Sequence, residues 1–161
     1  MQAMLFAMVF VAQIGSQERM EVIDISHEVF KILSRGIVAT LREMSLAKVE
    51  YGAPCSDLIL RTDAKNKNFS KLVGIIRNEV ARYYRALKTG QEKPVVHYYS
   101  RKQGFAIVGD NECGWRLALE KQAGRWKLHG IFISLPPPVQ KQETAKVTSV
   151  AEETKQTEDS H

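Results

Sequence analysis

The sequence predicts an α+β protein in which N-terminal helices pack on an antiparallel sheet of about four strands. Apolar residues recur at helical spacing up to Leu87 and with a period of two after Pro94, and glycine and proline separate the segments. Helices followed by a run of strands are the element order of the α+β class. The chain of 161 residues can form one domain with a hydrophobic core, which we assign to residues 17–135.

The N-terminus carries a continuous apolar run over residues 3–12, followed by a small polar step at residues 15–17. This run has the length of a signal-peptide core and is too short to span a bilayer. We therefore predict a signal peptide or apolar leader over residues 1–16, with cleavage after Ser16, and a secreted or periplasmic protein. The absence of Lys and Arg before the run, and Ile14 at position −3, leave open a core-packed or interfacial segment of a cytoplasmic protein.

Two cysteines, Cys55 and Cys113, lack the paired spacing of a zinc site, and we expect no metal. In an oxidising compartment they could close one disulfide, which would stabilise the fold by about 4 kcal/mol through loop entropy. In the cytosol they would instead be small buried apolar side chains.

A first helix is expected over residues 18–51, capped by Asp24 or Ser26 and stopped by residues 52–54. Gly36 interrupts this helix at a cost of about 1 kcal/mol relative to alanine, so the helix bends there or another element approaches closely. The apolar positions recur at spacings of three and four: Ile25, Val29, Ile32, Leu33, Ile37, Leu41 and Met44.

A second helix over residues 69–87 has the clearest two-faced pattern, and we expect it to cover the apolar faces of the strands. Asn68 or Ser70 would cap its start, and Thr89-Gly90 would end it. Its apolar arc consists of Phe69, Leu72, Val73, Ile76, Val80, Tyr83, Tyr84 and Leu87.

Strands are expected over residues 95–100, 105–109, 114–120 and 125–133, whereas residues 57–62 are either a short strand or a loop. The last two strands form a hairpin with a four-residue loop, which places Glu120 opposite Arg125 and therefore Trp115 opposite Gly130. One face of this hairpin holds Trp115, Leu117, Leu119, Trp126 and Leu128. Residues 136–161 contain few large apolar side chains and are predicted to be a disordered tail.

The segment GWRLALEKQAGRWKLHGIFI, residues 114–133, resembles the last two strands of the nuclear transport factor 2-like group and its cystatin-like relatives. In that group a Gly-Arg-Trp-Lys turn commonly leads into the final strand. The resemblance implies a curved, cone-shaped sheet closing on a helix, with a cavity or the flat sheet face as working surface. The group includes enzymes, binding modules, immunity proteins and secretion-system parts, so the fold does not select a function. Unlike the group, this chain offers only residues 57–62 as a strand or hairpin before the main sheet.

His97 is the candidate catalytic residue. On a regular strand it would share a face with Tyr99, and inside an apolar cone it could act as an acid or base. Its orienting carboxylate would be one of three residues: Asp63, Asp110 or Glu112. No catalytic pair can be carried over from the resembled group. We assign the wall of a ligand cavity to Tyr99, Trp115 and Trp126.

Basic residues are concentrated along the second helix, although the net charge of the whole chain is only +5. Lys71, Arg82, Arg85 and Lys88 could bind an anionic surface or a phosphate backbone. Nucleic-acid binding would usually add exposed aromatic side chains for stacking, whereas the neighbouring tyrosines belong to the apolar arc. A solvated helix face is the simpler interpretation.

The function best supported by the sequence is an exported, non-enzymatic binding or protein-interaction module that uses the sheet face or a modest cavity. One alternative is a small acid–base enzyme with His97 in the cavity, and another is a basic domain that binds nucleic acid or an anionic surface. No cofactor or transmembrane span is indicated. The sheet face could also mediate a homodimer.

Overall fold

The computed structural model describes residues 2–136, with side chains from residue 15 onward. These residues form three helices, namely α1 (Gln2–Arg35), α2 (Val38–Met44) and α3 (Lys67–Lys88), and six strands. The strands are β1 (Ser45–Gly52), β2 (Leu60–Asp63), β3 (Val95–Ser100), β4 (Phe105–Gly109), β5 (Trp115–Gln122) and β6 (Arg125–Ile133). The predicted tail lies almost wholly outside the described residues.

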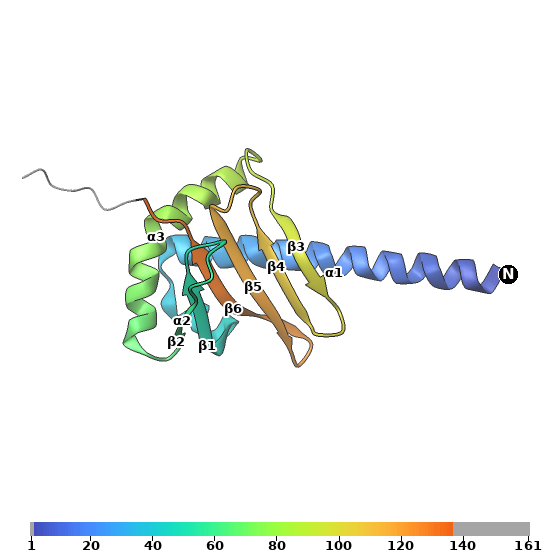
Figure 1. Cartoon of the computed structure of the whole chain (residues 1–161), viewed down its shortest axis with the longest axis horizontal. Coiled ribbons are helices and arrows are strands. Elements are labelled where there is room, and N and C mark those ends of the chain that lie inside the picture. Colours follow the sequence, from blue (N-terminus) through green and yellow to red (C-terminus); the bar gives the residue numbers. More distant parts are fainter. Residues whose placement is uncertain (1, 137–161) are drawn as a thin grey trace, which may run out of the picture.

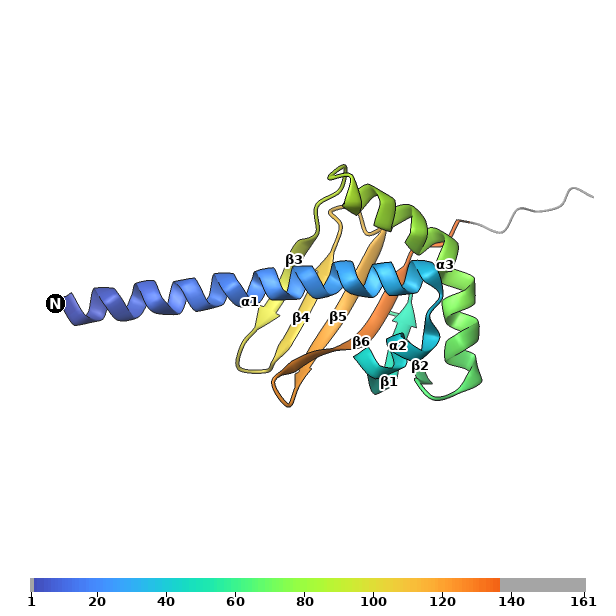
Figure 2. The ribbon, with the colours of Figure 1, turned by 180° about the vertical axis from the view of Figure 1, so that it is seen from behind.

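All strands belong to one open sheet with the order β2-β1-β6-β5-β4-β3. Neighbouring strands are antiparallel except β1 and β6, which are parallel. The α+β class is therefore confirmed, but the expected four-stranded antiparallel cone is wrong, because the sheet is mixed, has six strands and is not strongly curled. The helices lie on one side of this sheet and leave the other side uncovered (Figure 1, Figure 2).

Of the two additional strands, β1 comes from a segment that was expected to be helical, whereas β2 overlaps residues 57–62, where a short strand was one of the two alternatives. Helix α1 ends at Arg35, where Gly36 takes a left-handed conformation with φ of +68°, and α2 ends at Met44. Residues 45–52 then form β1 and pair with both β6 and β2. Without β1, β6 would present an unpaired edge, so pairing in the sheet outweighs a helical pattern that is weak after Met44.

Helix α1, rather than α3, crosses the central strands (Figure 2). Phe30 of α1 packs edge-on against Trp115 of β5, with ring centroids 4.5 Å apart, and both side chains are fully buried. Helix α3 packs against α1 and toward the β1–β2 end of the sheet. Its two-faced pattern is confirmed, since Ile76 and Val80 are buried, but the expected cap is wrong. Asn66 caps the helix through its Oδ1, which accepts a hydrogen bond from the backbone N–H of Asn68 at 3.0 Å.

The β5–β6 hairpin has the expected faces but a different register. The turn consists of Ala123 and Gly124, with φ of 46° and 76°, and Gln122 pairs with Arg125. The register shifts by one further residue between Ala118 and Leu119, so Trp115 lies opposite Ile133 instead of Gly130. The shift near the turn is two residues, an even number, so the predicted core face of the hairpin is retained and both tryptophans are buried on it.

No helix within residues 2–136 has the length and apolar character that a membrane crossing requires. Helix α1 continues through the predicted leader, and its N-terminal part projects beyond the edge of the sheet (Figure 1, Figure 2).

Candidate functional site

A polar pocket lies between α1 and the hairpin ends of the sheet, and we call it the helix-side pocket. Its volume is about 260 Å³. It is lined by Glu18 of α1, Tyr99 of β3, Arg101 and Gly104 of the β3–β4 turn, Lys121 of β5 and Trp126 of β6. Two of the three predicted cavity residues, Tyr99 and Trp126, therefore share this pocket, with ring centroids 6.4 Å apart.

The third predicted cavity residue, Trp115, lies elsewhere. It is fully buried against Phe30 at the opposite end of β5, where the core is closed.

Gly104 holds the β3–β4 turn against β5 at the wall of this pocket. Its φ of +59° favours glycine, and a Cβ at this position would approach the Cβ of Lys121 to 3.1 Å. The backbone carbonyl of Gly104 accepts a hydrogen bond from the Lys121 N–H at 2.7 Å. The turn therefore brings Arg101 and Lys121 to the same pocket although they are distant in sequence.

Three buried polar atoms of the helix-side pocket have no hydrogen-bond partner: Glu18 Oε2, Tyr99 Oη and Trp126 Nε1. Trp126 as a whole is only 6% exposed. A buried polar atom without a partner costs about 1–3 kcal/mol, so such groups are uncommon in folded proteins outside functional sites. Three of the five such atoms in the described part of the chain belong to residues that line this one pocket, which is why we treat it as the candidate binding site.

The electrostatic balance of the pocket is positive. Glu18 Oε1 lies 3.7 Å from Arg101 Nε and 3.8 Å from Lys121 Nζ, which is within ion-pair range but beyond hydrogen-bond length. A third cation, Arg19, lies over the Tyr99 ring with 5.7 Å between the guanidinium carbon and the ring centroid. One carboxylate thus faces two cationic side chains, and a third cation lies beside the Tyr99 ring.

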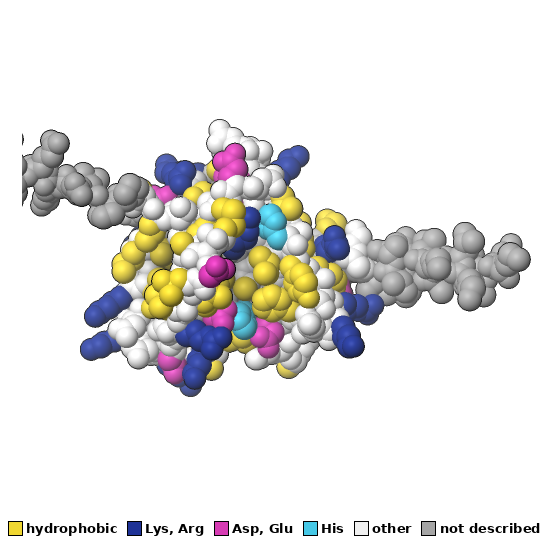
Figure 3. Space-filling view, viewed as in Figure 1, with side chains coloured by type: hydrophobic (Ala, Val, Ile, Leu, Met, Phe, Trp, Pro, Cys, Tyr) yellow, Lys and Arg dark blue, Asp and Glu magenta, His cyan; other side chains and the backbone are white. Residues whose placement is uncertain are grey.

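The uncovered side of the sheet carries a second, more apolar pocket of about 370 Å³, which we call the outer-face pocket. Its walls include Ile59, His97, Tyr98, Arg116 and Phe132. Figure 3 shows hydrophobic side chains gathered over the middle of this side, with histidine and charged side chains around them.

His97 lies in the outer-face pocket because β3 is irregular. The register of β3 against β4 shifts between Val96 and Tyr98, so His97 lines this pocket together with Tyr98. Tyr99 packs against the core on the helix side. The expectation that His97 and Tyr99 share a face is therefore wrong, and the β-bulge is the physical reason.

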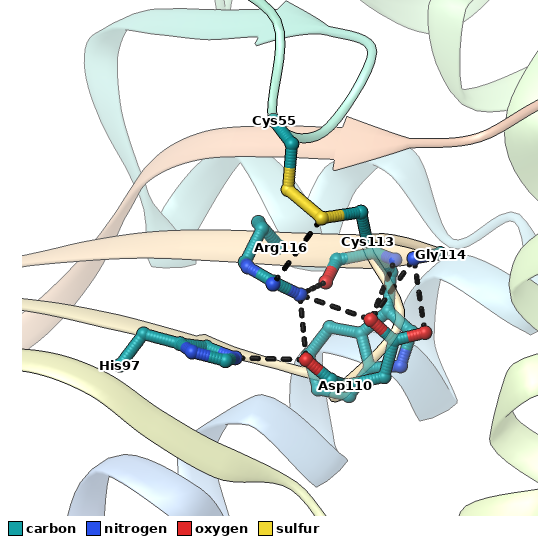
Figure 4. A network of polar contacts seen from close by, with 7 residues as sticks. Cys55, His97, Asp110, Cys113, Gly114 and Arg116 are labelled. Atoms are coloured by element: carbon teal, nitrogen blue, oxygen red, sulfur yellow. Dashed lines mark hydrogen bonds and ion pairs between the residues drawn. A yellow bond between two sulfur atoms is a disulfide. The ribbon is translucent and has the colours of Figure 1, made fainter.

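The ring of His97 is engaged by backbone rather than by a carboxylate. Its Nε2 lies 2.8 Å from the carbonyl oxygen of Asp110, which can only accept, so Nε2 carries the proton (Figure 4). The Asp110 carboxylate instead accepts hydrogen bonds from the Gly114 N–H at 2.9 Å and from Arg116 Nη1 at 2.9 Å. Asp110 is thus used to shape the β4–β5 loop.

That loop is also held by a disulfide between Cys55 and Cys113, which joins it to the β1–β2 loop (Figure 4). The disulfide lies at the edge of the outer-face pocket, because Cys55 is one of the residues that line it. It resolves the two alternatives for the cysteines in favour of a bond, which is typical of proteins from oxidising compartments.

The closed end of the helix side contains a second glutamate beside a tryptophan. Burial raises the pKa of the Glu92 carboxyl, and the charge of Asp110 raises it further, whereas the indole N–H of Trp115 opposes the shift. Glu92 Oε2 and Trp115 Nε1 nevertheless do not meet hydrogen-bond geometry. The surroundings of Glu92 therefore favour the neutral form of its carboxyl more than water does.

The predicted anion-binding residues Lys71, Arg82, Arg85 and Lys88 are all exposed on α3. Arg82 is already engaged, since its Nε and Nη2 donate to Glu79 at 3.1 and 3.0 Å and its guanidinium lies 4.5 Å from the Tyr83 ring centroid. The described residues contain no group of His, Cys, Asp and Glu arranged to hold a metal ion.

Sequence reasoning missed Glu18, Arg101 and Lys121. Lys121 was placed in a four-residue loop, whereas the two-residue turn extends β5 and directs Lys121 to the Trp126 side, with Nζ 5.5 Å from the ring centroid. Two consecutive residues with positive φ usually require Asn-Gly, and the Ala-Gly pair here gives no such signal. A register that used this tighter turn would have found Lys121.

Comparison with known proteins gives no family. No family model matches the sequence, and no curated protein matches it. A solved structure that resembles the chain is the crystal structure of a DUF4783 family protein from Bacteroides ovatus ATCC 8483 at 1.40 Å resolution. The likeness has a TM-score of 0.33 and 15% identity, and it covers 65% of this chain and 88% of that chain. A TM-score of this size carries no argument about function.

Proposed function

We propose that this chain is an exported binding module that holds a small polar ligand in the helix-side pocket, without catalysing a reaction. The observation that carries the proposal is the set of three buried polar atoms without partners on Glu18, Tyr99 and Trp126. A ligand that satisfies them would recover part of the free energy that the fold loses there. The resemblance to the nuclear transport factor 2-like group is compatible with this role, since a cavity between helix and sheet is one of the working surfaces it implies.

Two features support export. The disulfide Cys55–Cys113 favours an oxidising compartment. In addition, α1 makes ion pairs with the hairpin ends from Glu18, while the helix before it projects beyond the sheet (Figure 1). The predicted cleavage after Ser16 falls near this boundary and would place Glu18 in the first turn of the mature helix.

The acid–base alternative receives less support. It needs His97 in an enclosed cavity beside a carboxylate, whereas His97 is exposed, lines an open apolar pocket and is hydrogen-bonded to a backbone carbonyl. The alternative of a basic surface module rests on the exposed cations of α3 alone.

A ligand screen tests the proposal. The oxidised, purified protein is heated with chemically diverse small metabolites, including neutral sugars, amines, carboxylates and phosphate esters, and the change in Tm is recorded. We expect compounds that raise the Tm of the wild type and of Trp115→Phe, but raise that of Trp126→Phe much less. The second substitution keeps an aromatic ring while removing the pocket N–H, and the first is its control at the closed end.

The proposal is wrong if no compound raises the Tm, or if every active compound stabilises Trp126→Phe as much as the wild type. The export component is checked separately by the intact mass of the protein from its host. The mass should lack residues 1–16 and two hydrogens.

A further inference from the structure

The unpartnered atoms of the helix-side pocket differ in what they need. Glu18 Oε2 is an acceptor, the Trp126 indole N–H is a donor, and the Tyr99 hydroxyl can act as either. These atoms are closed off from solvent, so a ligand reaches them only where a neighbouring side chain moves aside. A ligand that satisfies all of them must then present both a hydrogen-bond donor and an acceptor. A hydrocarbon or a simple cation would leave at least one of these atoms without a partner.

The charges around the pocket determine which part of the ligand is ionised. Arg101 and Lys121 lie within 4 Å of Glu18 Oε1 but form no hydrogen bond with it, so their N–H groups can still bind an oxyanion. Arg101 has a side chain 60% exposed, and Lys121 one that is 30% exposed, so they stand at the mouth of the pocket. An anionic group is thus favoured at the mouth.

Glu18 sets a second requirement. Its side chain is 18% exposed, and a plain anion placed beside it would be repelled. The repulsion is offset when the ligand also brings a hydroxyl or ammonium group that donates to Glu18 Oε2. The volume of about 260 Å³ is small for a ligand pocket, so the donor must lie within a few bonds of the anion.

We infer that the ligand of the helix-side pocket is a small organic oxyanion, a carboxylate or phosphate ester, that carries a hydroxyl or ammonium group close to the anionic centre. This inference rests on the proposed function and narrows it to a ligand class. Lys121 and Arg101 hold the oxyanion, Glu18 accepts from the ligand donor, and the Trp126 N–H donates to a ligand oxygen.

Matched ligands test the inference by calorimetric titration. 2-Hydroxybutyrate and 2-aminobutyrate carry both groups, butyrate lacks the donor, and 2-hydroxybutyramide lacks the charge. Glycerol 3-phosphate and propyl phosphate form the corresponding phosphate pair and distinguish the two sources of oxyanion. A hydrogen bond to a charged group contributes about 1.5–3 kcal/mol. In the carboxylate set, the phosphate set or both, the anion that carries a hydroxyl or ammonium group should therefore bind about 10-fold or more tightly than the anion that lacks it.

Variants of the protein test which side chain binds the donor group of the ligand and which binds its anionic group. Glu18→Gln should remove the preference for the donor-bearing anion while leaving the binding of its donor-free partner unchanged or stronger. Lys121→Met should weaken both anions by about 10-fold, whereas Lys102→Met should not, although it makes the same change in net charge. Lys102 is an exposed lysine of the same β3–β4 turn and does not line the pocket.

The inference is overturned if neither anion set binds at about 10 mM, if Glu18→Gln keeps the donor preference, or if Lys121→Met behaves like Lys102→Met. Its failure is distinguishable from failure of the proposed function. A neutral compound that stabilises the wild type but not Trp126→Phe would preserve the binding function and refute the ligand class. If the diverse screen also yields no pocket-dependent compound, both proposals are wrong.

Discussion

The two tryptophans of the β5–β6 hairpin lie on the same face of the sheet but in opposite surroundings. Trp115 is fully buried against Phe30 of α1. Trp126 lies beneath the cation of Lys121 at the wall of the helix-side pocket. Each tryptophan has a glutamate nearby with one unpartnered oxygen, Glu92 at the closed end and Glu18 at the open end.

The difference shows that the face of a strand determines burial but not chemical surroundings. The same helix, α1, covers both ends, and it presents Phe30 at one and Glu18 at the other. The β4–β5 loop, held by Asp110 and the disulfide, fastens the closed end. The open end is completed by Arg101 of the β3–β4 turn and by Lys121 near the end of β5. We therefore expect stability to depend on the closed end and binding on the open end.

The largest expected effect is on the closed end. Trp115→Ala should lower the free energy of unfolding by about 3–5 kcal/mol, because it leaves a cavity in a packed core. Trp126→Ala should cost about 2 kcal/mol, because water can enter the space beside the pocket. Urea denaturation of the oxidised proteins measures both. Equal losses would show that the two ends are built alike.

Removal of the disulfide should have the next effect. The double substitution Cys55→Ser and Cys113→Ser should lower the free energy of unfolding by about 4 kcal/mol, since it releases a loop closed over a sequence separation of 58 residues. Ligand binding in the helix-side pocket, measured where the variant is still folded, should not change. Weaker binding by the folded variant would indicate that the open end depends on the disulfide.

Glu92→Gln tests the electrostatics of the closed end. The raised pKa means that folded Glu92 holds its proton more tightly than unfolded Glu92, so its contribution to stability is full below the ordinary pKa of 4.5 and is lost as the pH rises through the folded pKa. Glutamine cannot ionise and should therefore stabilise the protein at neutral pH. This gain should shrink as the pH falls through the raised folded pKa and should vanish below the ordinary pKa of 4.5. Chemical denaturation of the wild type and of Glu92→Gln from neutral pH to below pH 4.5 measures this gain. A gain that stays constant with pH would contradict a raised pKa for Glu92.

The smallest effect is expected at the open end. Lys121→Met should change the free energy of unfolding by less than about 0.5 kcal/mol, because its ion pair with Glu18 is long and partly exposed. Lys102→Met provides the control for net charge. Thermal unfolding without ligand measures both, and a loss of more than about 1 kcal/mol for Lys121→Met alone would assign this lysine a structural role.

Regular periodicity made much of the fold predictable. The strands at residues 95–100, 105–109 and 125–133 have the predicted bounds, and the buried face of α3 is the predicted one. The core face of the β5–β6 hairpin was also correct despite the wrong register, because a shift of two residues near its turn preserves which side chains point inward.

The candidate site was only partly predictable. Tyr99 and Trp126 are aromatic positions on strands and were found from pattern alone. Glu18 could not be assigned, because a charged residue in a helix is ordinarily solvated, and only the path of α1 across the hairpin ends makes it part of a pocket. Arg101 and Lys121 depend on two turns whose geometry the sequence does not signal.

Local residue pattern by itself determined the α+β class, the faces of α3 and the hairpin, and the availability of two cysteines for one bond. Tertiary structure alone decided that residues 45–52 become a strand, that α1 lies across the sheet, and that His97 is displaced to the outer face. The physical reason is the sequence separation over which each feature is decided. Periodicity reflects which side of one helix or strand is apolar, whereas strand order, bulges and pockets depend on contacts with residues distant in sequence.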